Sequence, residues 1–169
     1  MVDCGLTFNS PLNPAHDKDE YVKRHELVAA DPSFIEDRRD QLAGIIITHA
    51  HEDHVGGIPY LWERFKQPIY TTKFTAEVLR RKLSEVEFGH LVDIVEIEPL
   101  DEFTIGPFSV KWLPITHSLP EPCGLMISTP AAKVFHTGDW KLDSNPVVGE
   151  GVNRDHFMHL ASLNVDAML

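Results

Sequence analysis

The sequence predicts a mixed α/β (α+β) fold, and three patterns support this prediction. Residues 44–47 form a continuous apolar, β-branched run, which is typical of a buried strand. Residues 108–112 alternate apolar and polar side chains, as a strand with one buried face does. Residues 76, 79 and 83 are apolar at helical spacing. At 169 residues the chain suits one domain with a substantial core.

The amino-terminal part is expected to hold two strands and one helix. A strand at residues 1–4 leads into a long polar loop. Asp31 is the predicted N-cap of a short helix over residues 32–41, and Pro32 occupies its first position, where proline is favoured. The buried strand is expected over residues 44–48.

The rest of the chain continues to alternate helices and strands. The glycine pair at 56 and 57 precedes a helix that is expected to end near Phe65. The further expected elements are a strand at 68–71, a helix at 73–87, a strand at 92–97, a hairpin of strands 103–105 and 108–115, strands at 125–128 and 133–136, a helix at 154–163 and a final apolar strand at 164–169.

Residues 48–57 concentrate metal-ligand side chains at the end of the buried strand. His49, His51, Asp53 and His54 fall within six positions. Imidazole nitrogens and carboxylate oxygens suit Zn²⁺, and α/β sheets usually keep their chemistry where a strand ends and a helix begins. A polar loop whose histidines only cap a helix is the alternative. Four ligand-type residues in six positions need more than capping to explain them.

The spacing within this motif divides the ligands into two groups. His49 and His51 point to the same side of an extended segment, so they can share one metal. Asp53 and His54 lie beyond the bend and are better placed for a second ion. Two-metal hydrolytic sites keep their ions roughly 3.5–4 Å apart.

The pattern His49-x-His51-x-Asp53-His54 resembles the signature of the metallo-β-lactamase superfamily. The resemblance implies a four-layered αββα sandwich. It also implies that His117, at the end of the strand 108–115, is the third histidine of the first metal site. A hydrogen-bonded core or surface histidine is the alternative for this residue.

Two aspartates acquire roles through the same resemblance. Asp139, in the segment Thr137-Gly138-Asp139, resembles the aspartate that bridges both metals, since a carboxylate has two oxygens. Asp3 resembles the aspartate of the first motif, which orients the histidine loop without touching metal. The implied metal ligands are therefore His49, His51, Asp53, His54, His117 and Asp139, of which Asp53, His54 and Asp139 are also the implied catalytic residues.

Longer phrases resemble bacterial ribonuclease J, a member of the β-CASP group of this superfamily. They are DPSFIEDRRDQLAGI, ITHAHEDHVGGIPYLW, PITHSLPEPCGLMISTP and VFHTGDWKLDSNPVVGEG. The resemblance implies a metal-dependent ribonuclease with 5′→3′ exonuclease and endonuclease activity. It also implies an RNA substrate and two zinc ions, with Mn²⁺ or Mg²⁺ as alternative metals.

Residues 1–169 are expected to form only part of a lactamase domain, with the β-CASP and C-terminal parts absent. The chain opens directly at the first motif, stops after an apolar strand, and carries a long charged segment at residues 10–26. A last metal-binding histidine would lie beyond residue 169. The chain alone is therefore expected to hold the second ion weakly and to cleave RNA slowly or not at all.

Composition leaves two other functions open. The net charge of −11 disfavours a nucleic-acid surface, although two bound cations would offset it locally. A lactonase- or thioesterase-type hydrolase of small molecules would also explain this acidity. A non-catalytic binding or scaffold module that has kept the fold is the other alternative. No apolar run is long enough for a membrane span and no signal peptide is evident. Cys4 and Cys123 are too few for a disulfide framework. A cytoplasmic protein without a membrane partner is expected, and homo-oligomerisation remains open.

Overall fold

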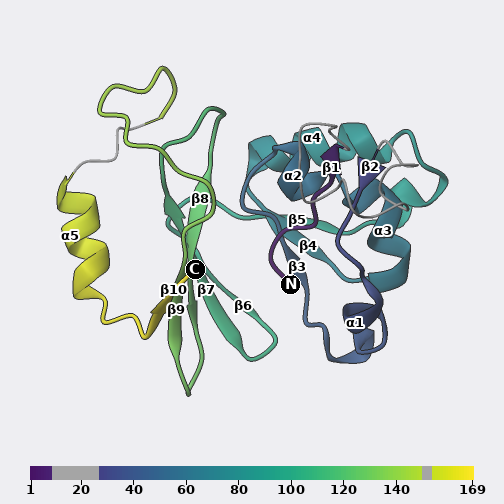
Figure 1. Ribbon diagram of the computed structural model, residues 1–169, viewed down its shortest axis with the longest axis horizontal. Coiled ribbons are helices and arrows are strands. Elements are labelled where there is room, and N and C mark those ends of the chain that lie inside the picture. The colour runs from purple at the N-terminus through teal and green to yellow at the C-terminus, as the bar shows by residue number, and fades with distance from the viewer. Residues whose placement is uncertain (9–26, 150–153) are drawn as a thin grey trace, which may run out of the picture.

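Four layers make up the computed structural model, which describes residues 1–8, 27–149 and 154–169. Two sheets lie at the centre, helices α1 to α4 cover one of them, and α5 lies beyond the other (Figure 1). This is the αββα order that the sequence resemblance implies. The long charged segment at residues 10–26 lies outside the described residues. Within the described part, no helix combines the length and apolar character that crossing a bilayer requires.

The first sheet is parallel and has the strand order β3-β4-β5. Apolar side chains of β3 and β4 pack against α3 and α4, in a core that includes Ile45, Ile69, Trp62, Leu79 and Leu83. The elements are β3 (Ile45–Ile46), β4 (Ile69–Thr71), β5 (Ile94–Glu96), α1 (Ser33–Glu36), α2 (Glu52–Val55), α3 (Ile58–Phe65), α4 (Lys73–Leu83) and the 3₁₀ helices η3 (Arg39–Gln41) and η4 (Glu87–Leu91).

The second sheet is mixed and has the order β10-β9-β8-β7-β6, with only β9 and β10 parallel. Leu113, Met126 and Phe135 pack with Leu160 of α5 on its outer side. The elements are β6 (Glu102–Ile105), β7 (Phe108–Pro114), β8 (Cys123–Ser128), β9 (Lys133–His136), β10 (Ala167–Met168) and α5 (Arg154–Ser162); β1 (Thr7–Phe8) and β2 (Leu27–Val28) form a separate antiparallel pair.

A core between the sheets holds their inner faces together. Val110 and Trp112 are fully buried there and cluster with Leu125 of the neighbouring strand β8 and with Ile46 of β3 in the other sheet. The predicted alternation in β7 is thus confirmed for these two residues. Phe108, at the start of the strand, is 40% exposed. The two sheets therefore present their strand ends to the same region.

Three predicted elements differ from the structure. Residues 1–4 make only one bridge, between Val2 and Ile46, because Asp3 has a φ of +57° and leaves the extended conformation. The predicted helix at 32–41 is split into α1 and η3, since Arg38 has non-helical dihedral angles between them. Its N-cap is Pro32 and not the predicted Asp31, whose carboxylate accepts the Ser33 N–H instead. Helix α4 stops at Leu83, after which the backbone bonds change to shorter 3₁₀-type spacing.

Candidate metal centre

The histidine motif follows β3, where the chain leaves the first sheet. The Ile47 N–H donates to Tyr70 O, and the Thr71 hydroxyl donates to Ile47 O at 2.8 Å. These bonds to β4 fix the backbone immediately before the motif. His49 is consequently buried, with 1% of its surface exposed, and His51 lies directly before α2.

Three imidazoles converge at one point. His51 Nδ1 lies 3.1 Å from His49 Nε2 and 3.1 Å from His117 Nε2. Ligand nitrogens around a tetrahedral zinc, each about 2.0–2.1 Å from it, are roughly 3.3–3.4 Å apart. The spacing of the three histidines therefore fits a small divalent cation. His117 comes from the loop after β7, so the second sheet completes a group that begins on the first.

A second group lies beside the first and includes a carboxylate. Asp139 Oδ1 is 3.4 Å from His54 Nε2, and Asp139 Oδ2 is 3.9 Å from His117 Nε2. The two oxygens of Asp139 thus face the two groups. His49, His54 and Asp139 also offer ligand atoms that all lie within 4.8 Å of one another.

Asp53 lies at the edge of this arrangement. Its Oδ2 is 3.8 Å from His54 Nε2, and its side chain is 67% exposed. It does not belong to either compact group of possible ligands that the described residues form. The structure thus brings together five of the six residues implied by the resemblance and leaves the sixth nearby in solvent.

Asp3 contacts the histidine loop directly, as the resemblance implies. Its Oδ1 accepts the Thr48 N–H at 2.8 Å, and its Oδ2 accepts the Thr48 hydroxyl at 2.9 Å. The same Oδ2 lies 2.7 Å from His54 Nδ1. Because Nδ1 of His54 is engaged, its Nε2 is left facing Asp139 and the possible metal.

The turn that carries Asp139 is held on both sides. Gly138 has a φ of +57°, which suits glycine, and its N–H donates to His136 Nδ1 at 3.2 Å. On the other side, Lys141 N–H donates to Thr116 O, and the Thr116 hydroxyl donates to Lys141 O at 2.5 Å. This reciprocal pairing ties the loop of His117 to the loop of Asp139.

The sequence alone indicated no role for Thr48 or Thr116, although both are buried at the site. Their position is the signal that could have found them, since each directly precedes a candidate ligand histidine. Gly5 was also passed over. A side chain there would meet the backbone of Asp53, and that conflict is visible only in three dimensions.

The histidines of the site differ in how their surroundings shift their pKa values. Burial, followed by the neighbouring His54, lowers the pKa of His49 to about 4. Burial and the nearby His51 lower the pKa of His117. Burial opposes protonation of His54 as well, but the hydrogen bond and charge of Asp3 outweigh it and raise its pKa. His49 and His117 therefore offer neutral nitrogen lone pairs at neutral pH, which metal binding requires.

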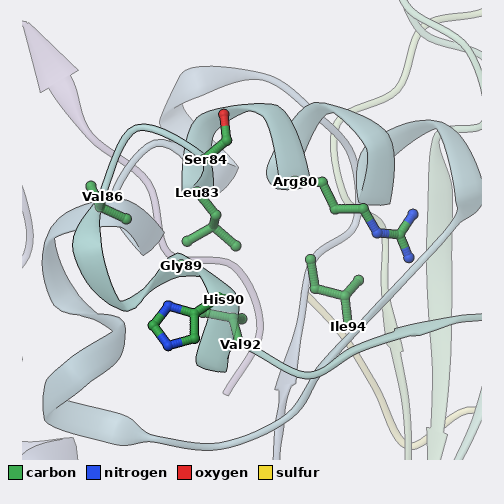
Figure 2. Close-up of a pocket in the computed structure, with 8 residues that line it drawn as sticks. All are labelled: Arg80, Leu83, Ser84, Val86, Gly89, His90, Val92 and Ile94. Atoms are coloured by element: carbon green, nitrogen blue, oxygen red, sulfur yellow. The ribbon is translucent and has the colours of Figure 1, made fainter.

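A separate cavity of about 600 Å³ lies between α4, η4 and β5 (Figure 2). Leu83, Val86, Val92 and Ile94 supply its apolar lining, and none of its lining residues belongs to the histidine groups. Its Arg80 already pairs with two glutamates, on α4 and on β5. The histidine groups, and not this cavity, therefore carry the candidate chemistry.

Known proteins resemble this chain along its full length. The family model described as "Beta-lactamase superfamily domain" matches residues 1–158. Ribonuclease J from Sinorhizobium meliloti is 38% identical over 100% of this chain and 28% of its own length. Ribonuclease J 1 from Streptococcus pyogenes is 40% identical over 87% of this chain and 25% of its own length. The chain thus spans about a quarter of the length of these relatives.

A solved structure supports the fold independently. A metallo-β-lactamase from Cronobacter sakazakii superposes with a TM-score of 0.56 at 19% identity, over 80% of this chain and 59% of that one. Similarity at this level of identity concerns the fold alone. The family match and the ribonuclease J relatives show that the chain belongs to the metallo-β-lactamase superfamily and is ribonuclease J-like in sequence.

Proposed function

We propose that this chain carries the metal centre of a ribonuclease J-like hydrolase that cleaves RNA phosphodiester bonds. The observation that carries the proposal is the convergence of His49, His51 and His117, whose ring nitrogens approach to 3.1 Å around one point. Asp139 extends this group toward His54. Clusters of this composition favour zinc over harder cations, since imidazole supplies most of the donors.

Each ligand has a proposed place. His49, His51 and His117 would hold the first ion, and Asp53 and His54 the second. Asp139 would bridge them, with one oxygen toward each group. Asp53 is the least constrained of these residues, and a shift of its exposed side chain toward His54 would bring it into the second set.

The chain's own residues prepare the site for hydrolysis. When bound, two divalent cations would supply Lewis acidity toward a phosphate and lower the pKa of an attacking water. His49 is buried and hydrogen-bonded at Nδ1, so its ring has one fixed orientation. Asp139 is 47% exposed, so the bridging carboxylate lies on the side that solvent and substrate reach. The phosphodiester would therefore approach from the side of Asp139, away from the core.

RNA as substrate is supported by the names of the relatives, which are called ribonuclease J at 38% and 40% identity. The net charge of −11 favours the second candidate, a hydrolase of small molecules. Activity of a whole ribonuclease J belongs to the proposal, because the chain corresponds to about a quarter of such a protein.

Metal content per purified chain, measured by elemental mass spectrometry, tests the metal centre. The wild-type chain should retain zinc, and His51→Gln should lose most of it. Asp139→Asn should lower the content as well, since the amide carries no charge. Asp143→Asn is the matched control, because Asp143 lies on the same turn but pairs with Lys141 at 3.3 Å. Wild-type chain that holds no divalent metal would contradict the proposal.

Substrate class needs a separate assay. The zinc-loaded protein, at high concentration and with long incubation because this chain alone is expected to act slowly, is offered 5′-monophosphorylated single-stranded RNA, a lactone and a thioester. Cleavage of RNA that Asp139→Asn abolishes and Asp143→Asn leaves intact supports the proposal. Turnover of the lactone or thioester with no RNA cleavage would favour the small-molecule hydrolase instead.

A further inference from the structure

One carboxylate oxygen serves both metal-ligand groups. Asp3 Oδ2 lies 2.7 Å from His54 Nδ1 and 2.9 Å from Thr48 Oγ1. Thr48 Oγ1 in turn lies 3.0 Å from His49 Nδ1. An unbroken chain of hydrogen bonds therefore runs from His49 of the first group to His54 of the second. Thr48 is fully buried, so water does not compete for its hydroxyl.

The donors and acceptors of this chain can be assigned from chemistry. A carboxylate only accepts hydrogen bonds, so the single hydroxyl proton of Thr48 points to Asp3. Thr48 Oγ1 can then only accept from His49, which places a proton on His49 Nδ1. The remaining nitrogen, His49 Nε2, is left with a lone pair, and it is the atom that faces His51 at 3.1 Å.

We infer that Thr48 is a positioning residue that transmits the charge of Asp3 to His49, and that one carboxylate thereby orients a histidine in each metal group. The inference rests on the proposed metal centre. It differs from the direct contact of Asp3 with His54, because in the described part of the chain His49 reaches Asp3 only through the Thr48 hydroxyl. Partners that fix ligand histidines typically change metal affinity 10–100-fold when removed.

Two substitutions separate the hydroxyl from the shape of Thr48. Thr48→Val keeps the branched side chain and removes the hydroxyl, whereas Thr48→Ser keeps the hydroxyl. Zinc affinity is measured by competition with a chromophoric chelator, after unfolding curves have shown that each metal-free variant is folded. Thr48→Val should bind the tighter zinc ion about 10-fold or more weakly, and Thr48→Ser within about 3-fold of wild type. A folded Thr48→Val with wild-type affinity would overturn the inference.

The tautomer of His49 in the wild-type protein gives a second readout that needs no variant to fold. Long-range ¹H–¹⁵N spectra of the metal-free protein should show His49 protonated at Nδ1 and bare at Nε2. The opposite tautomer would overturn the inference even if zinc binds. Wild-type protein that binds no zinc would instead refute the proposed function, while the tautomer would still decide whether the Thr48 link exists.

Discussion

Replacing Gly5 by alanine should damage the site although Gly5 contacts no candidate ligand side chain. A Cβ at this position would lie 1.7 Å from the Asp53 carbonyl oxygen and 2.1 Å from its carbon. Real Cβ atoms essentially never approach within 3.0 Å. The obstacle is backbone, so it cannot rotate away. Gly5→Ala must push the amino-terminal segment and α2 apart.

The size of the effect follows from the bonds that this separation would break. Cys4 N–H donates to His54 O at 2.7 Å and Leu6 N–H donates to Glu52 O at 2.9 Å, on either side of Gly5. Each bond contributes about 0.5–1.5 kcal/mol net. Overpacking adds about 1–3 kcal/mol. A loss of roughly 2–6 kcal/mol in the free energy of unfolding is therefore expected. Zinc affinity should fall with it, because Asp3 moves with the same segment.

Urea unfolding in the presence of chelator, followed by tryptophan fluorescence and circular dichroism, measures this loss without a metal contribution. Gly149→Ala is the control, because Gly149 has a φ of +82° but nothing within 4 Å of its Cβ position. It should cost about 1–2 kcal/mol from the backbone alone. A free energy of unfolding of Gly5→Ala within about 1 kcal/mol of the wild-type value, together with normal zinc binding, would refute this prediction.

Three further predictions concern the threonine clamp, the thiols and pH. Thr116→Val removes the hydroxyl that donates to Lys141 O and should weaken zinc binding several-fold, whereas Thr116→Ser should not. Equal zinc affinities of Thr116→Val and wild type in an equilibrium chelator assay would refute this prediction. Burial raises the pKa of Cys4 to about 11 and of Cys123 to about 12, so neither thiol should react with a disulfide reagent at pH 8 until the protein is denatured. Burial lowers the pKa of His49 from 6.5 to about 4, so between these pH values the unfolded chain binds a proton that the folded chain does not. This residue should therefore make the metal-free protein less stable as pH falls from 6.5 toward 4. A His49 ring resonance that titrates near pH 6.5 would contradict this prediction.

The local parts of the candidate site could be located from the sequence because their signals lie within short segments. His49, His51 and His54 lie on one turn, and the apolar run before them marks the strand that buries it. Gly138 and Asp139 likewise follow a strand that its own residues predict. The assignment of His117 depended on resemblance, since nothing in its flanking residues states that it meets His51 across the two sheets.

The remaining features depend on contacts between distant segments. Asp3 and His54 are 51 positions apart and meet at 2.7 Å, a contact that no pattern within either segment encodes. The helix expected at residues 32–41 is interrupted in the structure, and its sequence did not predict the interruption. Start signals such as Asp31 carry no information about where a helix breaks. Its break lies at Arg38, whose dihedral angles are not helical.

The possible ligands of the candidate metal centre differ in how deeply they are buried. His49 lies in the core with 1% of its surface exposed, while Asp139 and Asp53 are 47% and 67% exposed. An ion among His49, His51 and His117 would be held by geometry, since hydrogen bonds and ring contacts fix these side chains. An ion near the exposed carboxylates would exchange more readily with solvent. Thr48 and Asp3 connect the two groups by hydrogen bonds on their buried side and so hold them in fixed relative positions. The exposed side, where Asp139 lies, is left open to solvent.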